Sequence, residues 1–187
     1  FRLMSRGCIF AHKGPAAFAE NDDTTEQLTL LSIINSSAFG FLISVQLARV
    51  ELAQSFEVGI IQKTPFPDTD PDTTDRLATL AHRAWSLKRT LDTITETSHA
   101  FYLPAALRDR LGDYDPPAIE VELERIQAEI NDIAFDLYGF TDADRTAAMG
   151  PVSEGDDEAG EEEAEAPAPS TDPLLSWAVG VAFGRFD

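Results

Sequence analysis

The sequence has few of the residues on which covalent and metal chemistry depend. Cys8 is its single cysteine, so no internal disulfide can form and a reducing compartment is expected. The three histidines, His12, His82 and His99, are too scattered for the ligand spacing of a tetrahedral zinc site. No Gly-x-Ser-x-Gly elbow, phosphate-binding loop or glycine-rich cofactor turn is present. We therefore infer no catalysis and no metal site from this chain.

Long apolar runs are lacking as well. The longest, residues 38–53, is interrupted by Ser44, Gln46, Arg49 and Glu51, whereas a membrane span needs about 20 nearly uninterrupted apolar residues. No secretory signal pattern follows the first residue. We expect a globular cytoplasmic protein that does not associate with membranes.

Positive charge is scarce, with 14 Lys and Arg against 33 Asp and Glu and a net charge of −19. Such a balance argues against a nucleic-acid partner, because phosphate binding needs local cations. The distribution is uneven, however, since residues 1–63 hold five basic and six acidic side chains, whereas the other 124 hold 9 and 27. The first nineteen residues contain three basic side chains and no acid. Arg2, Arg6 and Lys13 therefore form a local positive patch on an acidic chain.

The segment 54–67 has the pattern of a short β-strand. Apolar Phe56, Val58 and Ile60 recur at every second position, as in a half-buried strand. Pro65 and Pro67 cannot continue a ladder because proline has no N–H to donate, so the strand is expected to end near Thr64. Two short helices are predicted before it, one started by the capping residues 22–25 and one from Ala38 to about Gln54.

Two long helices follow, each with an apolar stripe at heptad spacing. At 1.5 Å per residue each would span about 30 to 36 Å, and a connector of about twenty residues permits an antiparallel hairpin. We predict that hairpin, and the alternative that each stripe packs on a globular core stays open. The stripes are Leu77, Leu80, Ala84, Leu87, Leu91 and Ile94, then Ile119, Leu123, Ile126, Ile130, Ile133 and Leu137.

The final third changes character twice. Thr141 followed by Asp144 predicts a short helix that Gly150-Pro151 ends. Residues 154–165 then carry eight acids with glycine and alanine, too little apolar surface to offset the entropy of ordering, so they should form a flexible linker. Residues 174–186 are apolar and are expected to dock on the rest of the chain.

Four segments in a fixed order resemble one kind of protein. They are Gly7–Pro15, Gln54–Pro67, Leu137-Tyr-Gly-Phe140 and Trp177–Asp187. Together they look like the C-terminal, target-recognition side of the large adenine-specific DNA methyltransferases of type IIG restriction-modification and of BREX or DISARM phage-defence systems. The resemblance covers most of the chain except 151–172. It implies that the sequence stops inside a longer protein.

The resemblance implies N6 methylation of adenine by a separate catalytic domain of the same parent chain, with S-adenosylmethionine as cofactor. This chain lacks the motif that receives a flipped base, because Asp115-Pro116-Pro117 is followed by Ala118, which has no ring to stack on adenine. We interpret Asp115-Pro116-Pro117 as a helix start, where proline is favoured. The role left for this part is the choice of the DNA site.

The implied partners are double-stranded DNA, the catalytic domain and proteins of the defence system. Arg, Lys and Gln donate to phosphates and base edges. The candidate DNA-binding residues, which flank the strand-like segments, are Arg2, Arg6, His12, Lys13, Gln62 and Lys63.

These patterns predict an α+β fold, mainly α, in which short strands and two short helices precede a long antiparallel helical hairpin. The expected divisions are a recognition subdomain 1–67, a hairpin region 68–150, an acidic linker 151–172 and a docked apolar segment 173–187. The alternative function is a helical protein–protein interaction module that pairs through the two stripes. A weaker alternative is an acidic mimic of DNA, against which the near-neutral first third counts.

Overall fold

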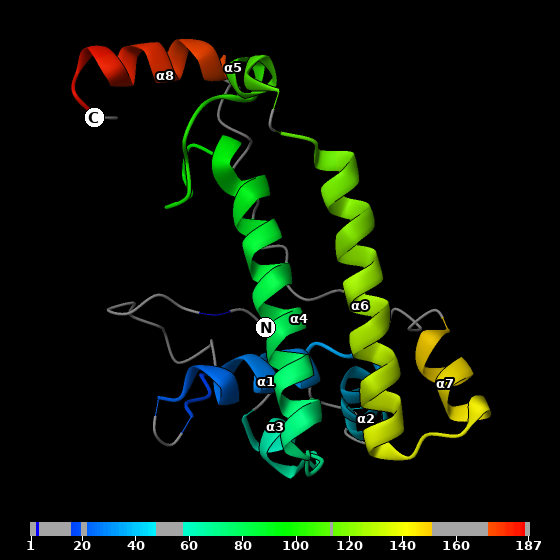
Figure 1. Ribbon diagram of the computed structural model, residues 1–187. Coiled ribbons are helices and arrows are strands. Elements are labelled where there is room, and N and C mark those ends of the chain that lie inside the picture. Colours follow the sequence, from blue (N-terminus) through cyan, green and yellow to red (C-terminus); the bar gives the residue numbers. More distant parts are fainter. Residues whose placement is uncertain are drawn as a thin grey trace. The chain divides into compact units, whose positions relative to one another are not determined.

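A computed structural model of the protein describes Leu3 and residues 16–19, 22–47, 58–112, 114–150 and 172–185. Helices make up the regular structure of these residues, and two of them are long (Figure 1). In chain order the elements are α1 Thr24–Ile34, α2 Ser37–Leu47, α3 Val58–Lys63, α4 Pro71–Leu91, the 3₁₀ turn η1 Asp92–Ile94, α5 Ala105–Arg108, the 3₁₀ turn η2 Asp109–Leu111, α6 Pro116–Tyr138, α7 Asp142–Met149 and α8 Pro173–Ala182.

The predicted α+β class is wrong for the part of the chain that is described, which contains no strand. The last residues of the expected strand, 58–63, form helix α3 instead. At its end the Thr64 N–H donates to the carbonyls of Ile60 and Ile61 at 3.0 and 3.2 Å. A short apolar run fits a buried helix as well as a strand, and periodicity alone does not separate them. The element nevertheless ends just before the prolines, as expected, because Pro65 disfavours helical geometry at Thr64. The other strand-like segment, 7–15, lies outside the described residues.

The three helices α4, α6 and α8 start with the same device. Each begins with proline, and each proline follows an aspartate whose side chain accepts first-turn backbone N–H groups. Asp70 accepts from Asp72 and Thr73 at 3.0 Å, Asp115 accepts from Ala118 at 3.2 Å, and Asp172 accepts from Leu174 at 2.9 Å. Proline at the first helical position loses no hydrogen bond, and the carboxylate satisfies N–H groups that the helix leaves open.

The chain divides into two compact units, Phe1–Arg83 with Arg125–Asp156 and Ala84–Glu124 with Asp157–Asp187. In the first unit, α1 packs on the first half of α4. The Ser32 hydroxyl donates to the Leu77 carbonyl at 3.0 Å, and the Thr29 hydroxyl donates to the Thr74 carbonyl at 3.1 Å. Beside these bonds, the buried residues Leu28, Ala78 and Ala81 form one apolar cluster.

Helix α2 packs on α6 in the same unit. The Ser37 N–H donates to Asn131 Oδ1 at 2.9 Å, and Ala38 joins Ala134 and Phe135 in a second cluster. Helix α7 begins with the capping box that Thr141 and Asp144 predict, and it follows α6 after the turn at Gly139. Its Ala148 packs against the same cluster.

The first half of α4 and the last half of α6 run antiparallel in this unit (Figure 1). Arg76 joins them through Glu129 at 2.7 Å. Stripe residues Leu77, Ile126 and Ile130 are buried, but α1 and α2 bury neighbouring parts of the same two helices. Within the first unit, the stripes therefore contribute to a multi-helix core and not to a two-helix seam alone.

The second unit is organised around Arg108. Its guanidinium lies over the rings of Tyr102 and Tyr114, at 5.3 and 5.7 Å from their centroids. Tyr114 Oη donates to the Leu91 carbonyl at 3.3 Å, and the Tyr102 N–H donates to the Thr93 carbonyl at 2.7 Å. Cation–π contacts of a largely desolvated arginine are worth up to about 2 kcal/mol. These contacts fix the connector between α4 and α6.

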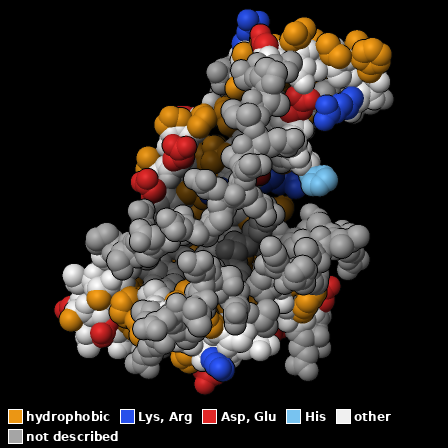
Figure 2. Space-filling model, turned by 180° about the vertical axis from the view of Figure 1, so that it is seen from behind, with side chains coloured by type: hydrophobic (Ala, Val, Ile, Leu, Met, Phe, Trp, Pro, Cys, Tyr) orange, Lys and Arg blue, Asp and Glu red, His pale blue; other side chains and the backbone are white. Residues whose placement is uncertain are grey.

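Polar contacts to Glu96 join helix α8 and the residue Arg185 after it to the rest of the second unit. Glu96 Oε1 accepts from the Ser176 hydroxyl and from Arg185 Nη1, both at 3.0 Å. Much of the apolar surface of the helix is exposed, and its hydrophobic side chains are visible in orange in the space-filling view (Figure 2). Phe183, just after the helix, is 85% exposed. The described part of the chain therefore leaves much of the apolar surface of α8 uncovered.

Among the described residues no single helix is long and apolar enough to cross a membrane. Helices α1 and α2 meet the length and composition test only as a pair, and they are bent by 58° at their junction.

Candidate nucleic-acid interface

Two of the six candidate DNA-binding residues, Gln62 and Lys63, lie side by side at the end of α3, and both are exposed. The other four, Arg2, Arg6, His12 and Lys13, lie outside the described residues. The described part of the candidate site therefore comprises the end of α3 and the segment 64–67 that follows it.

Thr64 fixes this segment to α2. Its side chain is buried, its hydroxyl accepts from Gln46 Nε2 at 2.8 Å, and it donates to the Ile60 carbonyl at 2.9 Å. One hydroxyl thus satisfies both the end of α3 and a side chain of α2. Because Thr64 directly follows Lys63, these bonds fix the backbone next to the two candidate donors to α2.

Tyr138 fixes the segment to α6. Its Oη donates to the Pro65 carbonyl at 2.9 Å, and burial raises the pKa of the Tyr138 phenol from 10.0 to about 12. Desolvation disfavours the charged phenolate, which is why the shift is upward. Pro65 and Pro67 further restrict the backbone of residues 64–67. Gln62 and Lys63 therefore project from a segment that is tied to two different helices.

Lys63 differs from several described basic side chains, which form ion pairs with carboxylates. Arg76 pairs with Glu129, Arg145 with Asp136 and Arg185 with Glu96. Within the described ranges, no hydrogen bond or ion pair engages the Gln62 or Lys63 side chain. An ammonium and an amide that keep their donors open match phosphate oxygens and base edges.

Sequence reasoning missed a second group of open cations on α4. Lys88 and Arg89 are exposed and form no ion pair with another described residue, and Arg89 lies over the Trp85 ring. The signal was present in the sequence, because no acidic residue occurs between Asp75 and Asp92. The apolar stripe of the same helix identifies only its buried face.

Two chemical possibilities can be examined in the part of the chain that is described, a metal site and the partial base-flipping motif. No group of three or more His, Cys, Asp or Glu side chains there could hold a metal ion. Asp115, the residue in the partial base-flipping motif, caps α6 through the Ala118 N–H.

We expect replacing Tyr138 with phenylalanine to remove the bond to Pro65 and lower the free energy of unfolding near neutral pH by about 0.5 to 1.5 kcal/mol. The wild-type phenol is protonated in the folded state up to about pH 12, whereas the unfolded phenol releases its proton near pH 10. The wild type therefore loses stability from this group as pH rises from 10 towards 12, and Tyr138→Phe does not.

The measurement is urea unfolding of both proteins, followed by circular dichroism, at several pH values from neutral to about 11.5. The stability gap between them should narrow above about pH 10. A gap that stays constant over the whole range would contradict the assigned burial of Tyr138.

No protein-family model matches the chain, and comparison with curated proteins and with solved structures finds no significant match either.

Proposed function

We propose that this chain is the DNA target-recognition region of a site-specific adenine DNA methyltransferase in a bacterial restriction-modification or phage-defence system. In this proposal a catalytic domain of the same parent chain binds S-adenosylmethionine and methylates N6 of adenine. The protein works in the cytoplasm on double-stranded DNA, with defence proteins as further partners. The resemblance of the four ordered sequence segments is the origin of the proposal.

The observation that carries it is the anchored segment from Gln62 to Pro67. Recognition of bases requires donors held in a fixed position, since loosely held side chains lose entropy when they bind. Thr64 and Tyr138 hold the backbone of this segment from two sides, while Gln62 and Lys63 stay exposed. Lys63 then suits a phosphate contact, and Gln62 suits the edge of an adenine.

The proposal predicts that the chain binds duplex DNA at low salt and selects among sequences. Labelled duplexes with random centres, captured by the chain and sequenced, should become enriched in one site that contains an adenine. Fluorescence anisotropy should then show that Lys63→Glu weakens binding to this site about tenfold or more, because reversing a charge removes a phosphate contact and adds repulsion.

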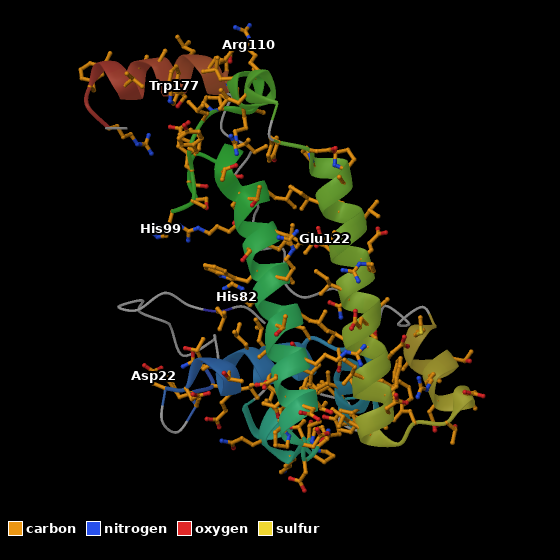
Figure 3. The ribbon with its side chains drawn as sticks, viewed as in Figure 1. Asp22, His82, His99, Arg110, Glu122 and Trp177 are labelled. Carbon is orange, nitrogen blue, oxygen red and sulfur yellow. The ribbon has the colours of Figure 1, made fainter. Side chains whose placement is uncertain are left out.

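Arg110→Glu is the matched control, with the same change of charge on another exposed side chain. Arg110 stands between Asp109 and Asp113 in the sequence and points away from its unit (Figure 3). It should change affinity little beyond the effect of net charge. Absence of binding to any duplex, or binding without enrichment of a sequence, would overturn target recognition by this chain.

The helical interaction module is less well supported. Stripe residues Leu77, Leu87, Ile126 and Ile130 are buried within the chain and are not open to another protein. Pairing of these stripes with a partner would first require the core to open.

A further inference from the structure

The outer face of α4 carries a small basic and aromatic surface in the second unit. Trp85, Lys88 and Arg89 are spaced three and four residues apart, so they share one side of the helix. We call these three residues the α4 strip. The opposite side of the helix contributes Leu87, which is buried, and the strip therefore faces outward.

No described carboxylate forms an ion pair with the two cations of the strip. Arg76, Arg125, Arg145 and Arg185 each have a carboxylate within 4 Å. Neither Lys88 nor Arg89 has one among the described residues. Two adjacent exposed cations that form no ion pair with a described carboxylate can together attract an anion.

The Trp85 ring positions one of these cations. The Arg89 guanidinium lies 5.6 Å from the ring centroid, and the tryptophan is 41% exposed. An exposed cation–π contact is worth about 0.5 to 1 kcal/mol, enough to limit the freedom of a long side chain. The planar guanidinium keeps N–H donors at its edge, and these match two oxygens of one phosphate.

We propose that the α4 strip binds the phosphate backbone of double-stranded DNA, as a contact separate from the Gln62 and Lys63 site. The inference rests on the proposed function, which supplies DNA as the ligand, and adds a sequence-independent contact to it. Lys88 and Arg89 would each neutralise phosphate charge, which raises affinity without reading bases. Trp85 acts on the DNA through Arg89 and is a positioning residue.

The test uses the whole chain carrying Trp177→Phe, so that Trp85 is its single tryptophan. Its fluorescence should change on titration with mixed-sequence duplex DNA, and acrylamide should quench it less in the complex. In the double variant Lys88→Gln/Arg89→Gln, the slope of log affinity against log salt should fall by about 1.8, with a loss of affinity of roughly 10- to 100-fold. The selected sequence should stay the same.

Arg110→Gln/Arg125→Gln provides a control with the same loss of charge. It should leave the salt slope within about 0.5 of the parent value, since neither side chain belongs to the strip. A matched titration with polyglutamate tests for acidic protein as the ligand. If polyglutamate alters Trp85 as strongly as duplex DNA does, the strip is a surface for acidic protein and the proposal fails.

The outcomes separate this inference from the proposed function. If the parent chain binds DNA and Lys63→Glu weakens binding, but the Lys88/Arg89 variant keeps the salt slope and Trp85 does not respond, only the α4 strip is overturned. If Lys63→Glu has no effect while the strip variant loses affinity, the strip holds and the assignment of the α3 site fails. If the chain binds no duplex at any salt concentration, both fail.

Discussion

Replacing Phe135 with alanine should destabilise the first unit more than any other single truncation that we consider. Phe135 is 1% exposed, packs with Ala38 and Ala134, and has its ring 5.6 Å from that of Phe140. Arg145 also lies over the ring at 5.3 Å. Removing a buried phenylalanine costs the transfer free energy of the ring and leaves a cavity, about 3 to 5 kcal/mol in total.

Urea unfolding followed by far-UV circular dichroism measures this loss. Val121→Ala on the same helix is the control, because Val121 is 66% exposed and its truncation should change stability by less than about 0.5 kcal/mol. If Phe135→Ala leaves no folded protein, Phe135→Leu keeps the test quantitative, with an expected loss of about 1 to 1.5 kcal/mol. A loss below 1 kcal/mol for the alanine variant would contradict the packing of α2 and α7 on α6.

Replacing Leu87 with aspartate should have an effect of similar size in the second unit. Leu87 is 6% exposed and belongs to the first apolar stripe. A carboxylate there either loses its hydration or takes up a proton, and both cost several kcal/mol on top of the lost apolar contact. We expect loss of more than about 4 kcal/mol, enough to unfold a marginally stable unit.

Leu175→Asp on α8 is the matched control, because the same substitution there falls on an exposed side chain. It should leave the unfolding transition within about 0.5 kcal/mol of the parent. Light scattering of all three proteins decides whether the stripe packs within the chain. A parent dimer that Leu87→Asp converts to a stable monomer would contradict internal packing and revive the interaction-module hypothesis.

The helix starts are the part of the fold that the sequence predicts best. Thr141 with Asp144, and Asp115 before two prolines, act locally, because cap and backbone N–H lie within one turn. The same locality explains why the long stripes identify α4 and α6. Local patterns do not identify the structure of residues 58–63. A few apolar residues there are compatible with a strand or a helix, and the rest of the fold decides between the two.

Side-chain pairing could not be predicted in the same way. Arg76 and Glu129 are 53 residues apart, and Arg185 and Glu96 are 89 apart, so only the folded chain brings them together. The distinction between Arg76 or Arg185 and the open Lys63, Lys88 and Arg89 depends on these long-range contacts. That distinction, and not the number of cations, locates the two surfaces proposed to contact DNA.

By itself, the sequence determined that this acidic chain forms long amphipathic helices, where they begin, and that a proline pair stops the segment after Lys63. These properties depend on neighbouring residues, whose interactions are present before the chain folds. Tertiary structure decided that residues 58–63 are helical and that Thr64 and Tyr138 tie the segment to α2 and α6. It also decided that Lys88 and Arg89 form no ion pair with another described residue. Such outcomes depend on contacts between distant residues, which form only when the helices pack.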